Sequence, residues 1–230
     1  MTEKILKRML QIIFQIIMIA AILFISSGRL DWWTAWAYLG IFVVGVCVNM
    51  TIMIRKNPEL TEELIEERSQ IKANTKKWDF YLAGLLSLSS TVVLLVSGLD
   101  IRFEWSEQIP FILQFAAMVL VVLGSGLGSW AIVSNPYFAS TVRIQSERGH
   151  RVVSNGPYQY IRHPGYAGWI LSGIALPVML GSLWALIPSG LTVVIFIIRT
   201  GLEDRTLRRE LPGYEEYSQN TCFRLVPYVW

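Results

Sequence analysis

Five long stretches of the sequence carry no charged side chain, and they constrain the fold more than any other feature. A helix that crosses a bilayer needs roughly 20 predominantly apolar residues. The first three stretches fit one crossing each, and the fourth fits one crossing followed by a polar exit. Charged residues make up only 16% of the chain, against about 25% in an ordinary soluble domain. The stretches are residues 9–28, 32–54, 80–99, 108–142 and 164–198.

The distribution of basic residues predicts how these segments cross the membrane. All but two of the 20 Lys and Arg residues lie in four segments: the N-terminus, 55–77, 143–162 and 199–224. Alternate crossings from a cytoplasmic N-terminus put all four segments on the cytoplasmic side, in agreement with the positive-inside rule. The pattern therefore predicts that the basic loops and the N-terminus face the cytoplasm.

The fifth stretch, residues 164–198, is expected to form a helical hairpin. A single crossing would leave the basic tail outside, whereas two crossings keep it inside. Pro177 and residues 181–182 are the expected break points. Because 35 residues are short for two full spans, the first helix, near 166–180, should be short or tilted, and the second should extend to about Glu203. The predicted fold is all-α and polytopic, with about six membrane segments and both termini in the cytoplasm.

The chain divides by character into two parts. Residues 1–133 form an N-terminal region of four spans with few polar groups, and residues 134–230 combine polar motifs with the hairpin. The second part is therefore the expected catalytic region, with a cytoplasmic connector before the hairpin and a cytoplasmic tail after it. Within the first part, Asn57 and Pro58 are typical of a helix start. The two histidines and two cysteines show no metal-ligand spacing, so no metal site is expected.

The sequence NGPYQYIRHPGYAG, residues 155–168, places turn residues, aromatic rings and cations directly before the hairpin. Pro164 disfavours helical geometry at His163 and suits the first turn of the next helix. Unpaired N–H groups at that helix start favour an anionic group, and Arg162 would lie beside it. The tyrosines of this segment add aromatic faces and hydroxyls. An interfacial belt of Tyr and Arg with turn residues is the alternative.

A second motif, IIRTGLEDRTLRREL from residue 197, lies at the cytoplasmic end of the second hairpin helix. Arg199 and Glu203 share one helix face because they are four residues apart. Ionisable groups at such depth are costly and are usually paired or functional; a snorkelling arginine with a surface ion pair is the alternative. If the hairpin turns on the far side, Arg162 and His163 meet Glu203 and Asp204. The pocket between them would suit a small zwitterionic cofactor that meets a lipid-dissolved substrate.

Together these motifs resemble the isoprenylcysteine carboxyl methyltransferase family, which is related to the phospholipid N-methyltransferases. The resemblance covers about residues 135–230, through G-P-Y-x-Y-x-R-H-P-x-Y-x-G, E-D-x-x-L, G-Y-x-x-Y and R-L-x-P. It implies an integral-membrane methyltransferase that uses S-adenosylmethionine and has no soluble Rossmann domain. Glu203 and Asp204 occupy the place of the family's acidic pair, commonly Glu-Glu, so the second acid is one methylene shorter. The expected cofactor-binding residues are Tyr158, Tyr160, Arg162, His163, Pro164, Tyr166, Glu203 and Asp204.

The chemistry of the cofactor assigns expected roles. Arg162 and the helix start suit its carboxylate, Glu203 suits its ribose hydroxyls or ammonium, and tyrosine faces suit its adenine or sulfonium. An acceptor carboxylate is already ionised at neutral pH, so it needs only a cation to orient it. Arg143 and Arg199 are the candidates for that catalytic role.

The expected acceptor is lipophilic, most simply a carboxylate such as that of a prenylated cysteine, with membrane lipids as the other partners and no nucleic acid. Three alternatives stay open. A phospholipid or amine N-methyltransferase would favour acidic groups near the methyl group. A sterol-type reductase that uses NADPH would need more cations than Arg162 to hold its phosphates. A non-enzymatic membrane scaffold or transporter subunit would not bind S-adenosylmethionine.

Overall fold

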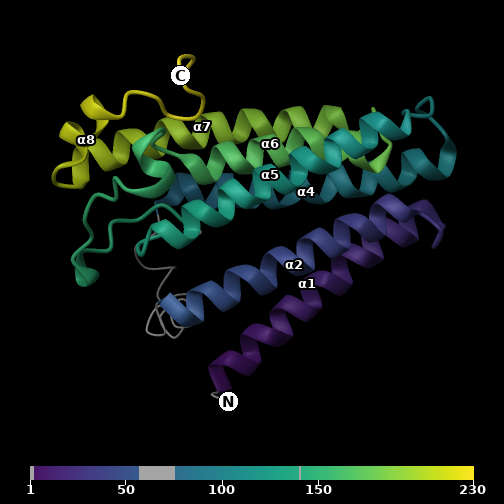
Figure 1. Ribbon diagram of the computed structural model, residues 1–230, viewed down its shortest axis with the longest axis horizontal. Coiled ribbons are helices and arrows are strands. Elements are labelled where there is room, and N and C mark those ends of the chain that lie inside the picture. The colour runs from purple at the N-terminus through teal and green to yellow at the C-terminus, as the bar shows by residue number, and fades with distance from the viewer. Residues whose placement is uncertain (1–2, 57–75, 140) are drawn as a thin grey trace.

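The computed structural model describes residues 3–56, 76–139 and 141–230, and the regular structure in them is entirely helical (Figure 1). The helix start predicted at Asn57 lies outside the described residues. Two 3-10 turns, η1 (Ser146–Arg148) and η2 (Gly156–Gln159), interrupt the connector between α5 and α6. The α-helices are α1 (Glu3–Ser27), α2 (Trp33–Lys56), α4 (Lys77–Phe103), α5 (Phe111–Ser134), α6 (Pro164–Leu180), α7 (Leu186–Glu210) and α8 (Tyr214–Asn220).

Six of these helices are the predicted membrane segments. Within the described residues, α1, α2, α4, α5 and α7 are long and apolar enough to cross a bilayer, and α6 is a shorter apolar helix of 17 residues. This confirms the all-helical, polytopic fold and the short first helix of the hairpin. The second hairpin helix includes Glu203 as expected, and α7 ends at Glu210, shortly before Pro212 and Gly213, which favour a helix end.

Pro177 lies inside α6 instead of breaking it, and a neighbouring helix explains why. Proline has no N–H, so the carbonyl of Gly173, four residues earlier, loses its helical donor. Ser189 Oγ of α7 donates a hydrogen bond to that carbonyl at 2.7 Å. The helix ends at Gly181, whose φ of +87° suits glycine. The substituted hydrogen bond thus preserves α6 and ties it to α7.

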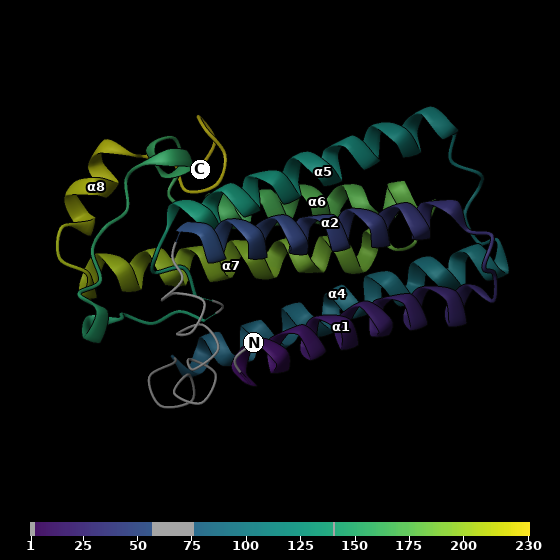
Figure 2. The same cartoon turned by 60° about the horizontal axis from the view of Figure 1, so that its bottom comes forward.

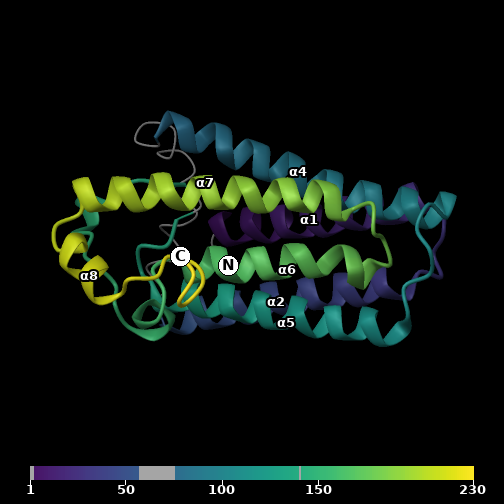
Figure 3. The ribbon, with the colours of Figure 1, turned by 90° about the horizontal axis from the view of Figure 1, so that it is seen from above.

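Consecutive apolar helices run in opposite directions, so the start of α6, the end of α7, α8 and the C-terminus lie at one end of the bundle (Figures 1 and 3). In Figure 2, α1 lies along α4, and α2 lies along α5 and α6. At the opposite end, Asp100 accepts hydrogen bonds from Ser106 Oγ at 2.6 Å and Ser182 Oγ at 2.5 Å. This carboxylate therefore joins the end of α4 to the turn between α6 and α7.

Small residues let α5 and α6 approach closely. A Cβ atom at Gly124 would lie 2.5 Å from the Gly168 carbonyl oxygen, whereas a Cβ at Gly126 would meet nothing within 4 Å. Ser172 Oγ of α6 donates to the Val121 carbonyl of α5 at 3.2 Å. Close backbone approach of this kind is typical of helix pairs in membranes. It holds α6, and with it one side of the polar end, against α5.

We expect Gly124→Ala to destabilise the protein, because the added methyl group meets backbone atoms that have little room to move. Overpacking of this kind costs about 1–3 kcal/mol, which should lower the midpoint of thermal unfolding in detergent. Gly126→Ala, two residues along the same helix, is the matched control. It should be neutral or stabilising, since Ala favours a helix over Gly by up to about 1 kcal/mol. Equal midpoints for the two variants would contradict the packing described for α5 and α6.

Candidate functional site

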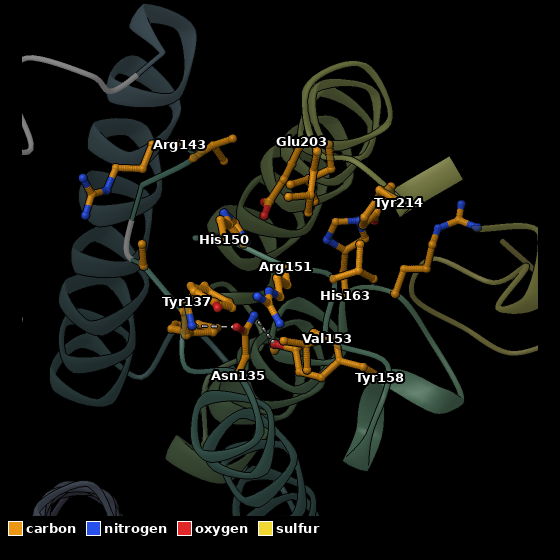
Figure 4. A pocket seen from close by; sticks show the side chains of 18 of the residues that line it. Asn135, Tyr137, Arg143, His150, Arg151, Val153, Tyr158, His163, Glu203 and Tyr214 are labelled. Atoms are coloured by element: carbon orange, nitrogen blue, oxygen red, sulfur yellow. Dashed lines mark hydrogen bonds between the residues drawn. The ribbon is translucent and has the colours of Figure 1, made fainter. Parts of the chain in front are cut away.

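A pocket lies at the polar end of the bundle, where α6 begins and α7 ends (Figure 4). Its empty space, part of which is open to solvent, is about 800 Å³. The connector between α5 and α6, the start of α6, the second half of α7 and α8 supply its lining residues.

The start of α6 has the geometry that its proline predicts. Pro164 is the first helical residue, and His163 before it is non-helical, with φ −124° and ψ 60°. The C-terminal segment pairs with this stretch: the N–H of Arg162 donates to Phe223 O and that of His163 to Arg224 O, both at 2.9 Å. The backbone of the two cations is therefore fixed by the helix on one side and the tail on the other.

The two ends of the hairpin meet as predicted. Arg162 Nε and Nη2 donate to the two carboxylate oxygens of Asp204 at 2.8 and 3.3 Å, and both side chains are buried. The remaining Arg162 nitrogen, Nη1, donates to the carbonyls of Ser218, Thr221 and Cys222 at 2.8–3.1 Å. A buried guanidinium needs such partners to offset its lost hydration. Arg162 thus joins α6, α7 and the segment after α8.

Asp204 is the centre of this polar network. Besides Arg162, it accepts hydrogen bonds from Tyr214 Oη at 3.1 Å and Arg224 Nε at 3.0 Å. Arg208 Nε lies at 3.3 Å and His163 Nε2 at 3.6 Å from its carboxylate. Only 1% of the Asp204 side chain is exposed, and it does not line the described pocket. Its carboxylate therefore links the elements that surround the pocket.

Glu203, the neighbouring acid, lines the pocket itself. Tyr166 Oη donates to its carboxylate at 2.5 Å, and the Tyr166 ring stacks on His163 with 5.8 Å between centroids and 7° between planes. In Figure 4, Glu203 and His163 lie on the same side of the pocket, next to Tyr214. One carboxylate, one imidazole and stacked aromatic faces are thus gathered at this wall.

Of the other residues expected in the site, some line the pocket and others do not. Tyr158 lines the pocket and is buried, whereas Tyr160 is 61% exposed, and neither it nor Pro164 lines the described pocket. Arg143 lines the pocket, but its guanidinium points away from Glu203 and His163 (Figure 4). Arg199 lies behind the lining residues and is paired with Asp79 at 2.7 and 3.1 Å.

The connector contributes lining residues that the sequence motifs did not identify. Tyr137 stacks on His150 with ring centroids 4.5 Å apart, and its hydroxyl donates to Gly149 O at 3.1 Å. Asn135 Oδ1 accepts from the Tyr137 N–H at 2.8 Å, and Arg151 also lines the pocket. The only sequence signal for this wall was the Asn-Pro-Tyr turn at 135–137.

Three buried tyrosines outside the membrane segments hold α8 against the site. Burial raises the pKa of Tyr158 and of Tyr214, with the Asp204 charge adding to the effect at Tyr214, and burial raises the pKa of Tyr217 to about 12. All three hydroxyls are therefore protonated at neutral pH and act as donors. Tyr217 Oη donates to Tyr158 O at 2.6 Å. The pocket thus offers acceptor, donor and aromatic groups together, which suits a small ligand with both charges and a flat ring.

We expect Arg162→Met to destabilise the polar end and to release the C-terminal segment. The substitution removes the donor for three carbonyls and one buried partner of Asp204, and breaking a buried ion pair typically costs about 3–5 kcal/mol. Thermal unfolding in detergent and limited proteolysis over residues 218–226 measure the two effects. Arg205→Met, which changes an exposed arginine next to Asp204, is the control. Unchanged protease resistance in Arg162→Met would show that the network does not hold the tail.

The comparisons with known proteins point to one family of membrane enzymes. The model of the isoprenylcysteine carboxyl methyltransferase family matches residues 116–209. A probable protein-S-isoprenylcysteine O-methyltransferase of Oryza sativa subsp. indica is 28% identical over 46% of this chain and 57% of that protein. The Homo sapiens protein-S-isoprenylcysteine O-methyltransferase is 32% identical over 54% of this chain and 44% of its own length. The A form from Arabidopsis thaliana is 27% identical over 63% of this chain and 65% of that protein.

The chain therefore spans less than two thirds of the length of these curated relatives. The matched region contains His163, Tyr166 of α6 and Glu203 of α7. The comparisons support the resemblance found in the motifs, since residues 116–209 are similar to the isoprenylcysteine carboxyl methyltransferase family.

Proposed function

We propose that the protein is a membrane O-methyltransferase that uses S-adenosylmethionine to methylate the carboxylate of a lipophilic acceptor, such as a prenylated cysteine. The observation that carries the proposal is the wall formed by His163, Tyr166 and Glu203 at the mouth of two apolar helices. It lies within the region that matches the family. The relatives, which are named as isoprenylcysteine O-methyltransferases, support the same chemistry.

The residues of the pocket fit the parts of S-adenosylmethionine. Glu203, held by the Tyr166 hydroxyl, is suited to the ribose hydroxyls or the ammonium group. The first turn of α6 has N–H groups without helical partners, which suit the carboxylate. The rings of Tyr137, Tyr158 and Tyr166 offer faces for the adenine and the sulfonium. Arg162 supports the site through the backbone and the tail, since Asp204 and three carbonyls engage its guanidinium.

When bound, S-adenosylmethionine supplies an activated methyl group: a carboxylate oxygen displaces the sulfur, which leaves a methyl ester and a neutral thioether. Because the acceptor carboxylate is already ionised, the protein needs no strong base and contributes mainly position and exclusion of water. Tyr166 borders both the polar pocket and an apolar cluster that contains Leu86, Ile195 and Phe196. This boundary suits an acceptor whose carboxylate enters the pocket while its lipid part stays among the helices. Of the two expected cations, Arg143 lines the pocket and remains the proposed group for orienting that carboxylate. Arg199 is paired with Asp79 and lies against the Tyr166 ring, so its proposed role is to support that ring.

We also propose that the pocket and both termini face the cytoplasm. The concentration of Lys and Arg in the segments at this end supports the orientation. In the described part of the chain, six apolar helices that alternate in direction support a position of both termini on one side of the membrane. A reporter fused after Trp230 should therefore be active in the cytoplasm, and activity on the other side of the membrane would exclude this topology.

Binding of the product cofactor tests the site directly. We expect purified protein in detergent to bind S-adenosylhomocysteine saturably in calorimetry. Glu203→Gln and His163→Ala should each weaken binding more than about tenfold, or about 1.4 kcal/mol, because the first removes the negative charge and the second the imidazole from the pocket wall. Glu210→Gln is the matched control, since Glu210 lies on the same helix, is exposed and pairs with Lys76. No binding heat from the wild-type protein would refute the methyltransferase proposal.

The chemical stability of the product tests the acceptor class. Protein incubated with a lipid extract and a donor labelled in its methyl group should transfer the label to a lipid. A methyl ester releases labelled methanol in alkali, as a carboxylate acceptor requires. Label that resists alkali would exclude a methyl ester and would contradict the proposed carboxylate acceptor.

A further inference from the structure

Asp79 does not line the pocket, but it contacts a residue that does. It is the most deeply buried acid of this kind among the described residues. It lies at the start of α4, outside residues 116–209, and its exposed fraction is 0%. Its Oδ1 accepts from Arg199 Nε at 2.7 Å, and its Oδ2 accepts from Arg199 Nη2 at 3.1 Å and from the Val142 N–H at 2.7 Å. One carboxylate therefore joins α4, the connector and α7.

The contact with Arg199 leads directly to the wall of the pocket. The Arg199 guanidinium lies 5.3 Å from the centroid of the Tyr166 ring, and Tyr166 in turn donates to Glu203. A bidentate pair of guanidinium and carboxylate fixes the plane of the guanidinium as well as its position. Asp79 therefore determines how Arg199 supports the ring that holds Glu203.

The contact with Val142 fixes a second wall. Val142 and Arg143 both line the pocket, and in Figure 4 Arg143 stands on the opposite side of the pocket from Tyr214. Just before Asp79, Lys76 Nζ pairs with Glu210 at the end of α7 at 2.7 Å. The start of α4 is thus bound to the connector and to α7 at once, and a change at Asp79 should move both.

We propose that Asp79 is a positioning residue for the methyl-transfer site. Its carboxylate holds Arg199 beneath Tyr166 and holds the connector at Val142, so an essential support of the pocket comes from the N-terminal half of the chain. The inference rests on the proposed function for its kinetic consequence. Its structural part, the attachment of the connector, stands independently of that function.

Asp100 offers a matched control for the test. It lies on the same helix, its exposed fraction is 2%, and it accepts hydrogen bonds from Ser106 and Ser182 at the opposite end of the bundle. Asp79→Asn and Asp100→Asn both remove one buried carboxylate charge from α4. Asp79→Asn also leaves the buried Arg199 without its carboxylate and should cost more stability, so the two variants are compared while both are folded. Under that condition a positioning role lowers kcat/KM only in the first.

The kinetic experiment measures methyl transfer from S-adenosylmethionine to an N-acylated S-prenylcysteine, below the unfolding temperature of every variant. We expect Asp79→Asn to lower kcat/KM for the acceptor between about tenfold and 100-fold, as small displacements at a reacting centre do. Asp79→Glu, which keeps the ion pair, should stay closer to wild type than Asp79→Asn. In an Arg199→Lys background, Asp79→Asn should add little, because residues that act through each other are not additive. Asp100→Asn should keep its kcat/KM.

Hydrogen exchange supplies the readout that does not depend on activity. We expect the Val142 amide to exchange faster in Asp79→Asn than in the wild type, and to be unchanged in Asp100→Asn. Unchanged exchange, or an equal loss of kcat/KM in the two Asn variants, would overturn the positioning role. If Asp79→Asn does not fold, a wild-type kcat/KM in Arg199→Lys would also overturn it. Wild-type protein that neither binds S-adenosylhomocysteine nor transfers a methyl group would refute the proposed function instead.

Discussion

The polar end of the molecule depends on one buried carboxylate, whose charge must be balanced by nearby cations and hydrogen-bond donors. Asp204 has lost nearly all its contact with water, and its ionised form is tolerable only if cations and hydroxyls replace that hydration. Arg162, Arg224 and Tyr214 supply them from three elements. Satisfying a single charge therefore draws the start of α6, the tail and α8 around the end of α7. The pocket is the space that this convergence leaves beside the network.

Features set by a single helix were predictable from the sequence. Uncharged stretches long enough for a bilayer identified the six apolar helices, and Pro164 identified the start of α6. The behaviour of Pro177 was not predictable in the same way. Its effect on α6 depends on whether another helix supplies the missing donor, and Ser189 of α7 does so for the Gly173 carbonyl, 16 residues earlier in the chain. A pattern within one helix contains no information on such a contact.

The same distinction applies to the site. The hairpin argument brought Arg162 together with Asp204, and the structure confirms that meeting. It did not predict that backbone carbonyls of residues 218, 221 and 222 would engage the rest of the Arg162 guanidinium, because carbonyls have no signature in a side-chain pattern. Asp79 was missed for a related reason. Its partner Arg199 is 120 residues away, and its only sequence signal is a lone acid beside an apolar stretch.

The adjacent acids of α7 differ in function because a helix turns about 100° between successive residues. Glu203 therefore faces the pocket when Asp204 faces the network. Their lengths also suit these positions. The longer side chain of Glu203 reaches the Tyr166 hydroxyl at the pocket wall, whereas the shorter one of Asp204 lies where several donors already surround its carboxylate. The shorter side chain of Asp204 therefore agrees with a structural role inside the protein, where its carboxylate is surrounded by donors and does not need to extend into the pocket.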